Sequence, residues 1–289
     1  MSPRICIATA FMYATIAASA LAQSSTAESA AELLGGCIQQ EAAQRAETNF
    51  YKSNEVLVSD RYPPFTKSIQ ARGLTFVALE NIPDSFLYEI ARTAEDMFPQ
   101  NADVDALKQA EILENLYAYS ATIPVLRESD LERLYEGHAG HNFENLMLQT
   151  SVCDIIMQTS TRQVMEVVEH LLHFVTDVGL HYAYPDQWGI SQRSEVFVEM
   201  ENAIAQGYYD ISKYQQEIDD EHLLLRVLIQ EFSYWAISTY WDLQQEYGSG
   251  EHEWTVATRA ELKEKMPTLY TLIEKTVDRV MKSPQPGVS

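Results

Sequence analysis

Two long helical patterns organise the second half of the chain. From 161 to 178, apolar residues recur at helical spacing and end beside Gly179; they are Val164, Val167, Val168, Leu171, Leu172, Val175 and Val178. The stretch from 220 to 247 is apolar on most sides in its middle, so it is expected to lie centrally in the fold. Further helices are predicted at 194–206 and at 258–281, the last of them interrupted by Pro267.

The first half mixes short runs of β-type residues with helical patterns. Strands are predicted at 55–59, 74–79, 122–126 and 144–149, and helices at 81–97, with Pro83 near the first turn, and at 103–119. Ser129 is expected to cap a short helix, and residues 137–141 are expected to form a loop.

These patterns predict an α+β, helix-dominated fold with a small sheet. The length suits one large domain or two small ones. We expect an N-terminal α+β part over 23–140 and a helical part over 141–282.

The first 22 residues have the three parts of a secretory signal peptide. Arg4 supplies the positive start, residues 5–18 are apolar and uncharged, and Ala20-Leu21-Ala22 is a small-x-small cleavage site. An apolar run of about 14 residues is short for a membrane anchor, which needs roughly 20. A secreted or periplasmic protein without a membrane span is therefore expected.

The net charge and the cysteine content limit which partners and which cellular compartment are expected. The formal net charge of −22 repels phosphate backbones, so a nucleic-acid partner is not expected. Cys6 lies in the signal peptide, which leaves Cys37 and Cys153. These two cysteines are either joined in a disulfide or two buried thiols, and the sequence leaves both possibilities open.

The helix predicted at 161–178 carries a polar stripe that could bind a metal ion. Glu166, Glu169, His170, His173 and Asp177 share one face, because residues three and four apart on a helix are neighbours. Two such side chains one turn apart can chelate a divalent ion from a single rigid helix. The ordinary alternative is a solvated helix face.

Glu231 sits in the middle of the long apolar helix. Its neighbours three and four positions away are Val227, Leu228, Tyr234 and Trp235, so its own helix offers no basic partner. A buried carboxylate there must find a partner in another element, stay protonated or bind a cation. Two readings remain open: a bond to a distant Arg or Tyr, and a third ligand for the histidine helix.

These two helices carry a resemblance to a known family. Glu169-His170-Leu-Leu-His173, followed by Glu231-Phe232, resembles the gluzincin-type zinc metallopeptidases, and the lethal-factor-like branch most of all. That family pairs a His-Glu-x-x-His helix with a glutamate on a downstream helix. Here the first two positions are exchanged, since Glu169 stands at the first His and His170 at the Glu.

A second resemblance covers roughly residues 140–255. Over this stretch the chain is similar to uncharacterised secreted proteins of marine microbes, which carry similar Glu-x-x-x-His, Ala-Tyr-Pro-Asp and Glu-Tyr/Phe-x-Tyr-Trp-Ala elements. This resemblance implies kinship but does not indicate which activity the protein has.

The gluzincin resemblance implies a zincin-like fold and a zinc site. Glu169, His173 and Glu231 would be the metal ligands, and His170 would replace the glutamate as general base. The alternatives are His170, His173 and Glu231 as ligands, with Glu166 or Glu169 as base, or a degenerate site that is only structural.

Two functions follow from these assignments. The first is a secreted metal-dependent hydrolase, peptidase-like, that acts on a peptide or small-molecule substrate. The second is a non-catalytic extracellular binding protein on a degenerate zincin-like scaffold.

Overall fold

The computed structural model describes residues 37–39, 41–42, 49–135, 137–159, 163–248 and 253–285. The predicted signal peptide, residues 1–22, lies outside this part of the chain. The described elements are β1 Leu57–Tyr62, β2 Phe65–Ala71, β3 Leu74–Ala78, α3 Asp84–Met97, α4 Ala106–Ala118, β4 Thr122–Arg127, α5 Leu131–Leu134, α6 Gly137–Gln149, β5 Ile156–Gln158, α7 Gln163–Phe174, the π-helix Val175–Leu180, α8 His181–Ala183, α9 Pro185–Trp188, α10 Glu195–Ala205, α11 Ser212–Glu217, α12 Glu221–Tyr240, α13 Leu243–Tyr247, α14 Arg259–Lys265, α15 Pro267–Lys275 and α16 Val277–Val280. The predicted α+β, helix-dominated fold with a small sheet is confirmed.

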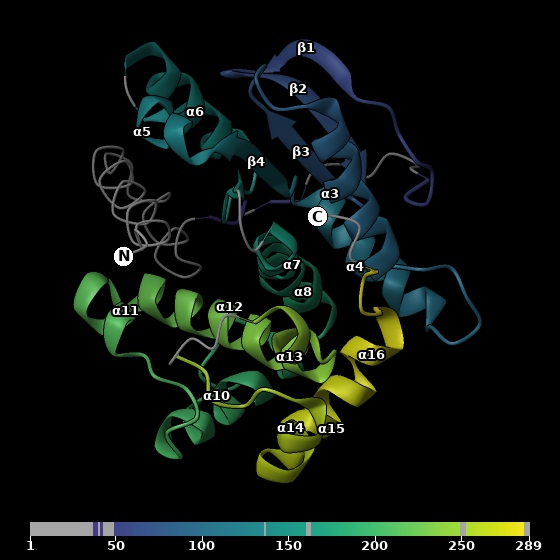
Figure 1. Ribbon diagram of the computed structural model, residues 1–289, viewed down its shortest axis with the longest axis vertical. Coiled ribbons are helices and arrows are strands. Elements are labelled where there is room, and N and C mark those ends of the chain that lie inside the picture. The colour runs from purple at the N-terminus through teal and green to yellow at the C-terminus, as the bar shows by residue number, and fades with distance from the viewer. Residues whose placement is uncertain are drawn as a thin grey trace.

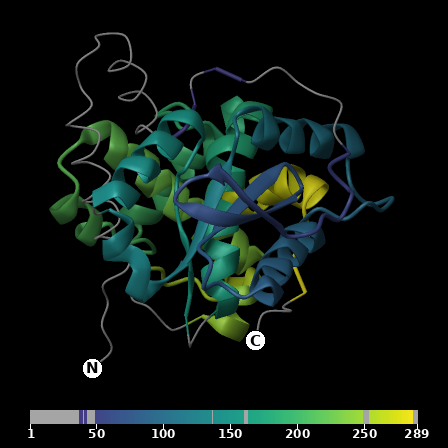
Figure 2. The ribbon, with the colours of Figure 1, turned by 90° about the horizontal axis from the view of Figure 1, so that it is seen from above.

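The five strands form one mixed sheet in the order β1-β2-β3-β4-β5. Strand β2 pairs antiparallel with β1 and with β3, whereas β4 is parallel to β3 and to β5. Parallel neighbours need crossover connections, and here the helices α3 and α4, and then α5 and α6, supply them. Figure 2 shows the purple β1–β2 hairpin at the front, with helices on both sides of the sheet.

Alternating strand residues divide between two hydrophobic clusters. Phe76 and Val125 belong to the main core, which includes residues of α3, α4, α7 and α12. Val77 and Leu126, one position later in each strand, pack in a smaller cluster with α5 and α6. Since successive side chains of a strand point to opposite faces, the two central strands are buried on both sides.

Helix α12 is the centre of the helical half, as its apolar pattern predicts. Its side chains are buried from 226 to 240, and it contacts α7, α10, α14 and α15. Figure 1 shows α7 between the sheet above and α12 below. The helix ends at Tyr240 and α13 begins at Leu243, because Asp242 takes a left-handed conformation with a φ of 60°. The predicted single helix over 220–247 is therefore two helices.

The segment after α5 corrects several predictions. Residues 137–149 form helix α6, where a loop and a strand were expected. The buried side chains of Phe143 and Leu146 are three positions apart, which is helical spacing. Ser129 lies in a short 3-10 helix and caps no helix through its side chain. The predicted boundary after residue 140 falls inside α6, and the sheet takes its last strand from 156–158.

The helix predicted to stop at Gly179 continues instead as a π-helix. Gly179 is buried inside this segment, where an added Cβ would lie 2.8 Å from Cγ2 of Ile112 in α4. The missing side chain thus permits close packing of the π-helix on α4. No helix of the described residues has the length and apolar character to cross a bilayer.

Cys37 and Cys153 form a disulfide, which settles the question that the sequence left open. The bond joins residues 116 positions apart and fastens the segment around Cys37 to the connection between α6 and β5. Gln39 strengthens this attachment, since its backbone N–H donates to Ser151 Oγ at 2.9 Å and its side chain donates to Thr150 O at 3.1 Å.

We expect loss of this disulfide to destabilise the protein. Replacing both cysteines, in Cys37→Ser/Cys153→Ser, should lower the free energy of unfolding by about 2–5 kcal/mol, because a long loop is no longer closed in the unfolded chain. Denaturant unfolding of the mature protein measures the change. A reductant should destabilise the wild type and leave the double variant unaffected; equal midpoints for the two proteins would contradict the expectation.

Candidate metal centre

The polar stripe of α7 points into the protein. The side chains of His170, His173 and Asp177 are buried, and those of Glu166 and Glu169 are half-buried. Helix α7 packs against α12 and β5, so its polar residues face neighbouring elements. The solvated helix face that the sequence left open is therefore wrong.

Three predicted residues meet between α7 and α12. Glu169 and His173 lie one turn apart on α7, Glu231 lies on α12, and one ligand atom from each lies within 4.8 Å of the other two. Nε2 of His173 is 3.7 Å from Oε2 of Glu231. Two ligand atoms of a tetrahedral zinc ion are roughly 3.4 Å apart, whereas a hydrogen bond requires about 2.7–3.2 Å. The spacing is closer to that of metal ligands.

Asp154 orients His173, and sequence reasoning missed it. Its Oδ2 accepts a hydrogen bond from Nδ1 of His173 at 2.7 Å. Burial acts to raise the pKa of Asp154, but His170 and His173 hold it below its usual range. Burial lowers the pKa of His173 despite the opposing effect of Asp154. The imidazole is thus neutral, with its proton on Nδ1 and its lone pair on Nε2.

That lone pair lies near the buried carboxyl group of Glu231, whose Oε2 is 3.7 Å away. Nε2 of His173 and Oε1 of Glu231 have no hydrogen-bond partner among the described residues, although both side chains are at most 2% exposed. Burial, and then the charges of Glu169, Glu253 and Asp154, raise the pKa of Glu231 well above its usual range, while Lys213 acts in the opposite direction. A cation between these groups would relieve both the repulsion and the missing hydrogen bonds.

His170, the predicted general base, turns to other partners. Its Nδ1 donates to the carbonyl oxygen of Glu166 at 2.6 Å, and its Nε2 forms an ion pair with Oδ1 of Asp154 at 3.4 Å. Burial acts to lower the pKa of His170, but Asp154, Glu166 and Glu169 outweigh it and raise the pKa to about 10. A protonated ring in these contacts is unsuited to the role of general base, or to that of a metal ligand.

Glu166, the other proposed base, links α7 to the sheet. Its Oε1 accepts a hydrogen bond from the backbone N–H of Met157 in β5 at 2.9 Å. The same oxygen lies 3.8 Å from Nδ1 of His170. The geometry thus favours Glu169, His173 and Glu231 as the ligand set over the alternative with His170.

A second group of polar side chains extends from Glu231 to the surface. Glu253 accepts hydrogen bonds from Tyr214 Oη at 2.6 Å and from Trp235 Nε1 at 3.3 Å, and it pairs with Lys213 at 3.2 Å. Trp235 follows Glu231 by one turn of α12, so the group lies on the same side of that helix. Lys213 is its outermost member, with a side chain that is 42% exposed.

Asp177, the last residue of the predicted stripe, pairs with Arg226 and is not part of the group formed by Glu169, His173 and Glu231. It pairs with Arg226 at 2.9 Å, and burial raises its pKa to about 6 despite that partner. Its carboxylate also lies within 4.8 Å of the sulfurs of Cys37 and Cys153. Because these sulfurs are bonded to each other, the three residues do not form a metal site.

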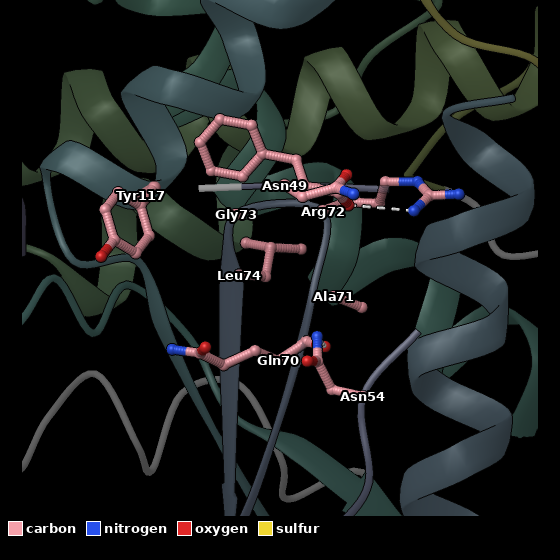
Figure 3. A pocket seen from close by; sticks show the side chains of 9 residues that line it. Asn49, Asn54, Gln70, Ala71, Arg72, Gly73, Leu74 and Tyr117 are labelled. Atoms are coloured by element: carbon pink, nitrogen blue, oxygen red, sulfur yellow. Dashed lines mark hydrogen bonds between the residues drawn. The ribbon is translucent and has the colours of Figure 1, made fainter. Parts of the chain in front are cut away.

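Figure 3 shows a pocket at the turn between β2 and β3. It is lined by residues of that turn, by parts of 49–54 and by Tyr117 of α4. The Arg72 guanidinium there donates to the carbonyl oxygens of Phe50 and Phe98, at 3.0 and 3.2 Å. Its charge is thus engaged by the backbone, and none of the three metal-site residues lines this pocket.

Comparisons with known proteins identify no relative: no protein-family model, no curated protein and no solved structure matches the chain.

The hydrogen bond from His173 to Asp154 predicts the effect of one substitution on metal binding. Asp154→Asn removes the negative charge behind the imidazole and one of the carboxylates that face His170. If these residues bind a divalent ion, its affinity should fall by about 10–100-fold, which is typical when the orienting carboxylate of a ligand histidine is lost. Competition with a chromophoric chelator measures the dissociation constant.

Asp186→Asn, at an exposed position of α9, is the matched control and should keep the wild-type affinity. Equal affinities of Asp154→Asn and the wild type, in a protein with an unchanged circular dichroism spectrum, would show that Asp154 does not support the site.

Proposed function

We propose that this protein is an extracytoplasmic metal-dependent hydrolase, peptidase-like, with zinc as the first candidate metal. Glu169, His173 and Glu231 would hold the ion, and a peptide or small molecule would be the substrate. The observation that carries the proposal is the pair of buried atoms, Nε2 of His173 and Oε1 of Glu231, that lack hydrogen-bond partners among the described residues.

The chemistry of the donor set fits a divalent cation. When both carboxyls are ionised as ligands, they and the neutral imidazole carry a formal charge of about −2, which a divalent ion balances, and zinc accepts both oxygen and imidazole nitrogen. The Asp154–His170 and Asp177–Arg226 ion pairs balance their own charges nearby. Cation binding therefore neutralises the ligand set without disturbing either pair.

The number of ligands supports a catalytic site. Structural zinc sites are completed by four protein ligands, whereas catalytic sites use three and keep one position for water or substrate. When bound, zinc would polarise a substrate carbonyl and lower the pKa of water. The contribution of this chain is to exclude solvent around His173 and Glu231, and to hold the imidazole through Asp154.

Two features support action outside the cytosol. The first 22 residues have the pattern of an export signal. The disulfide between Cys37 and Cys153 is of a kind that persists in oxidising compartments and is rare in the cytosol.

One observation favours a second candidate, a non-catalytic protein that keeps the metal site for binding. His170, the residue that the exchanged motif places where a general base belongs, is held by Asp154 and by the carbonyl of Glu166. A metal centre without a base would bind an ion and support little hydrolysis.

Elemental analysis of the purified mature protein tests the metal centre. We expect about one zinc per chain in the wild type, and a loss of most of it in His173→Ala and in Glu231→Gln, because each removes one of three ligands. His141→Ala, at a side chain that is 68% exposed on α6, should keep its zinc. A wild type that holds no metal and accepts none on dialysis against zinc would overturn the proposal.

A peptide-library digest then separates the two functions. A hydrolase should cleave peptides with zinc bound, stop when a chelator removes the metal, and lose activity in Glu231→Gln. A wild type that holds zinc and cleaves nothing in the library would favour the binding protein.

A further inference from the structure

We propose that Gln230 and Arg226 are positioning residues that fix the ring of His173 for metal binding, acting through Asp154. This inference rests on the proposed metal centre and adds two residues of α12 that lie behind it. It names side chains that do not contact the metal themselves and that the sequence patterns did not single out as part of the site.

The amide of Gln230 has only one orientation that suits its neighbours. Its Oε1 accepts a hydrogen bond from Nη1 of Arg226, one turn earlier on α12. A guanidinium is a donor only, so the carbonyl end of the amide must face it. The NH₂ end then faces Asp154, and Nε2 donates to Oδ2 of Asp154 at 3.4 Å.

Asp154 passes this orientation on to the imidazole. Its Oδ2 accepts hydrogen bonds from Nε2 of Gln230 and from Nδ1 of His173. Its Oδ1 accepts a hydrogen bond from the backbone N–H of Ile155 at 2.8 Å and pairs with His170. With contacts on both oxygens the carboxylate has no freedom to rotate. The His173 ring, hydrogen-bonded to it at 2.7 Å, keeps Nε2 directed toward Glu231.

Arg226 anchors the other end of this chain of contacts. It is buried and bonds Oδ2 of Asp177 at 2.9 Å, in the π-helix that directly follows α7. The contacts therefore start and end on the same continuous segment, which carries His173 and Asp177. Gln230 is next to the proposed ligand Glu231 on α12, and through Asp154 it connects this helix to His173 on α7.

Gln230→Met tests the inference, because it keeps the volume of the side chain and removes its polar atoms. In the cobalt-substituted protein, affinity for Co²⁺ should fall about tenfold, the lower end for loss of an outer contact, and the visible absorption bands should shift. In the metal-free protein, the NMR signal of the His173 Nδ1 proton should broaden or disappear. A merely structural role would move neither the bands nor this proton.

Gln109→Met is the matched control. Gln109 is 1% exposed on α4, and its amide donates to the carbonyl oxygen of Val280 at 2.7 Å, outside the metal site. This variant should lose comparable stability and keep the Co²⁺ affinity, the absorption bands and the His173 proton signal of the wild type.

The outcomes separate this inference from the proposed function. A wild type that binds Co²⁺, with a Gln230→Met variant equal to it in affinity, absorption bands and proton signal, overturns the positioning role alone. A wild type that binds neither Zn²⁺ nor Co²⁺ overturns the metal centre and, with it, the positioning of a ligand. Changes shared by Gln230→Met and Gln109→Met would also reject the positioning role, since they would reflect general destabilisation.

Discussion

The hydrogen bond between Asp154 and His173 is the contact on which the interior of the helical half depends. The His173 imidazole is removed from water and the Asp154 carboxylate is only 11% exposed, so their polar atoms depend on each other for hydrogen bonds. Burial keeps the imidazole neutral despite the opposing effect of Asp154 on its pKa, and the bond directs its second nitrogen at Glu231. Asp154 also meets His170 and Gln230, so one side chain connects the end of the sheet with both long helices.

Helix α12 places polar side chains where an apolar helix would pack without difficulty. Arg226, Gln230 and Glu231 are all buried on α12, most of whose buried side chains are apolar. Buried ionic groups rarely add stability compared with well-packed apolar residues. Their presence in the centre of the fold is better explained by a site that needs them, and perturbed carboxylates of this kind gather at functional sites.

Sequence periodicity predicted most of the longer helices and three residues of the candidate site, but not its full extent. Glu169 and His173 share a helix face, and Glu231 stands out in an apolar run, so local spacing was sufficient for them. Asp154 follows Cys153 in a connection without periodicity, and only the packing of β5 beside α7 brings it to His173. Gln230 is one of many glutamines, and its role depends on Arg226 and on a partner 76 positions away. Helix α6 was mistaken for a loop and a strand because its glycines and histidines suggested a turn.

The π-helix limits where homologues of this protein can lose residues. A π-helical turn holds more residues than an α-helical one, so a deletion there can be absorbed as ordinary helix. Such a deletion would leave His173, which precedes the segment, facing Glu231, but it would turn Asp177 away from Arg226. Deletions in surface loops are usually tolerated. The contact between Asp177 and Arg226 depends on the number of residues in the π-helix 175–180. Homologues that retain this contact should therefore retain all six residues of the segment.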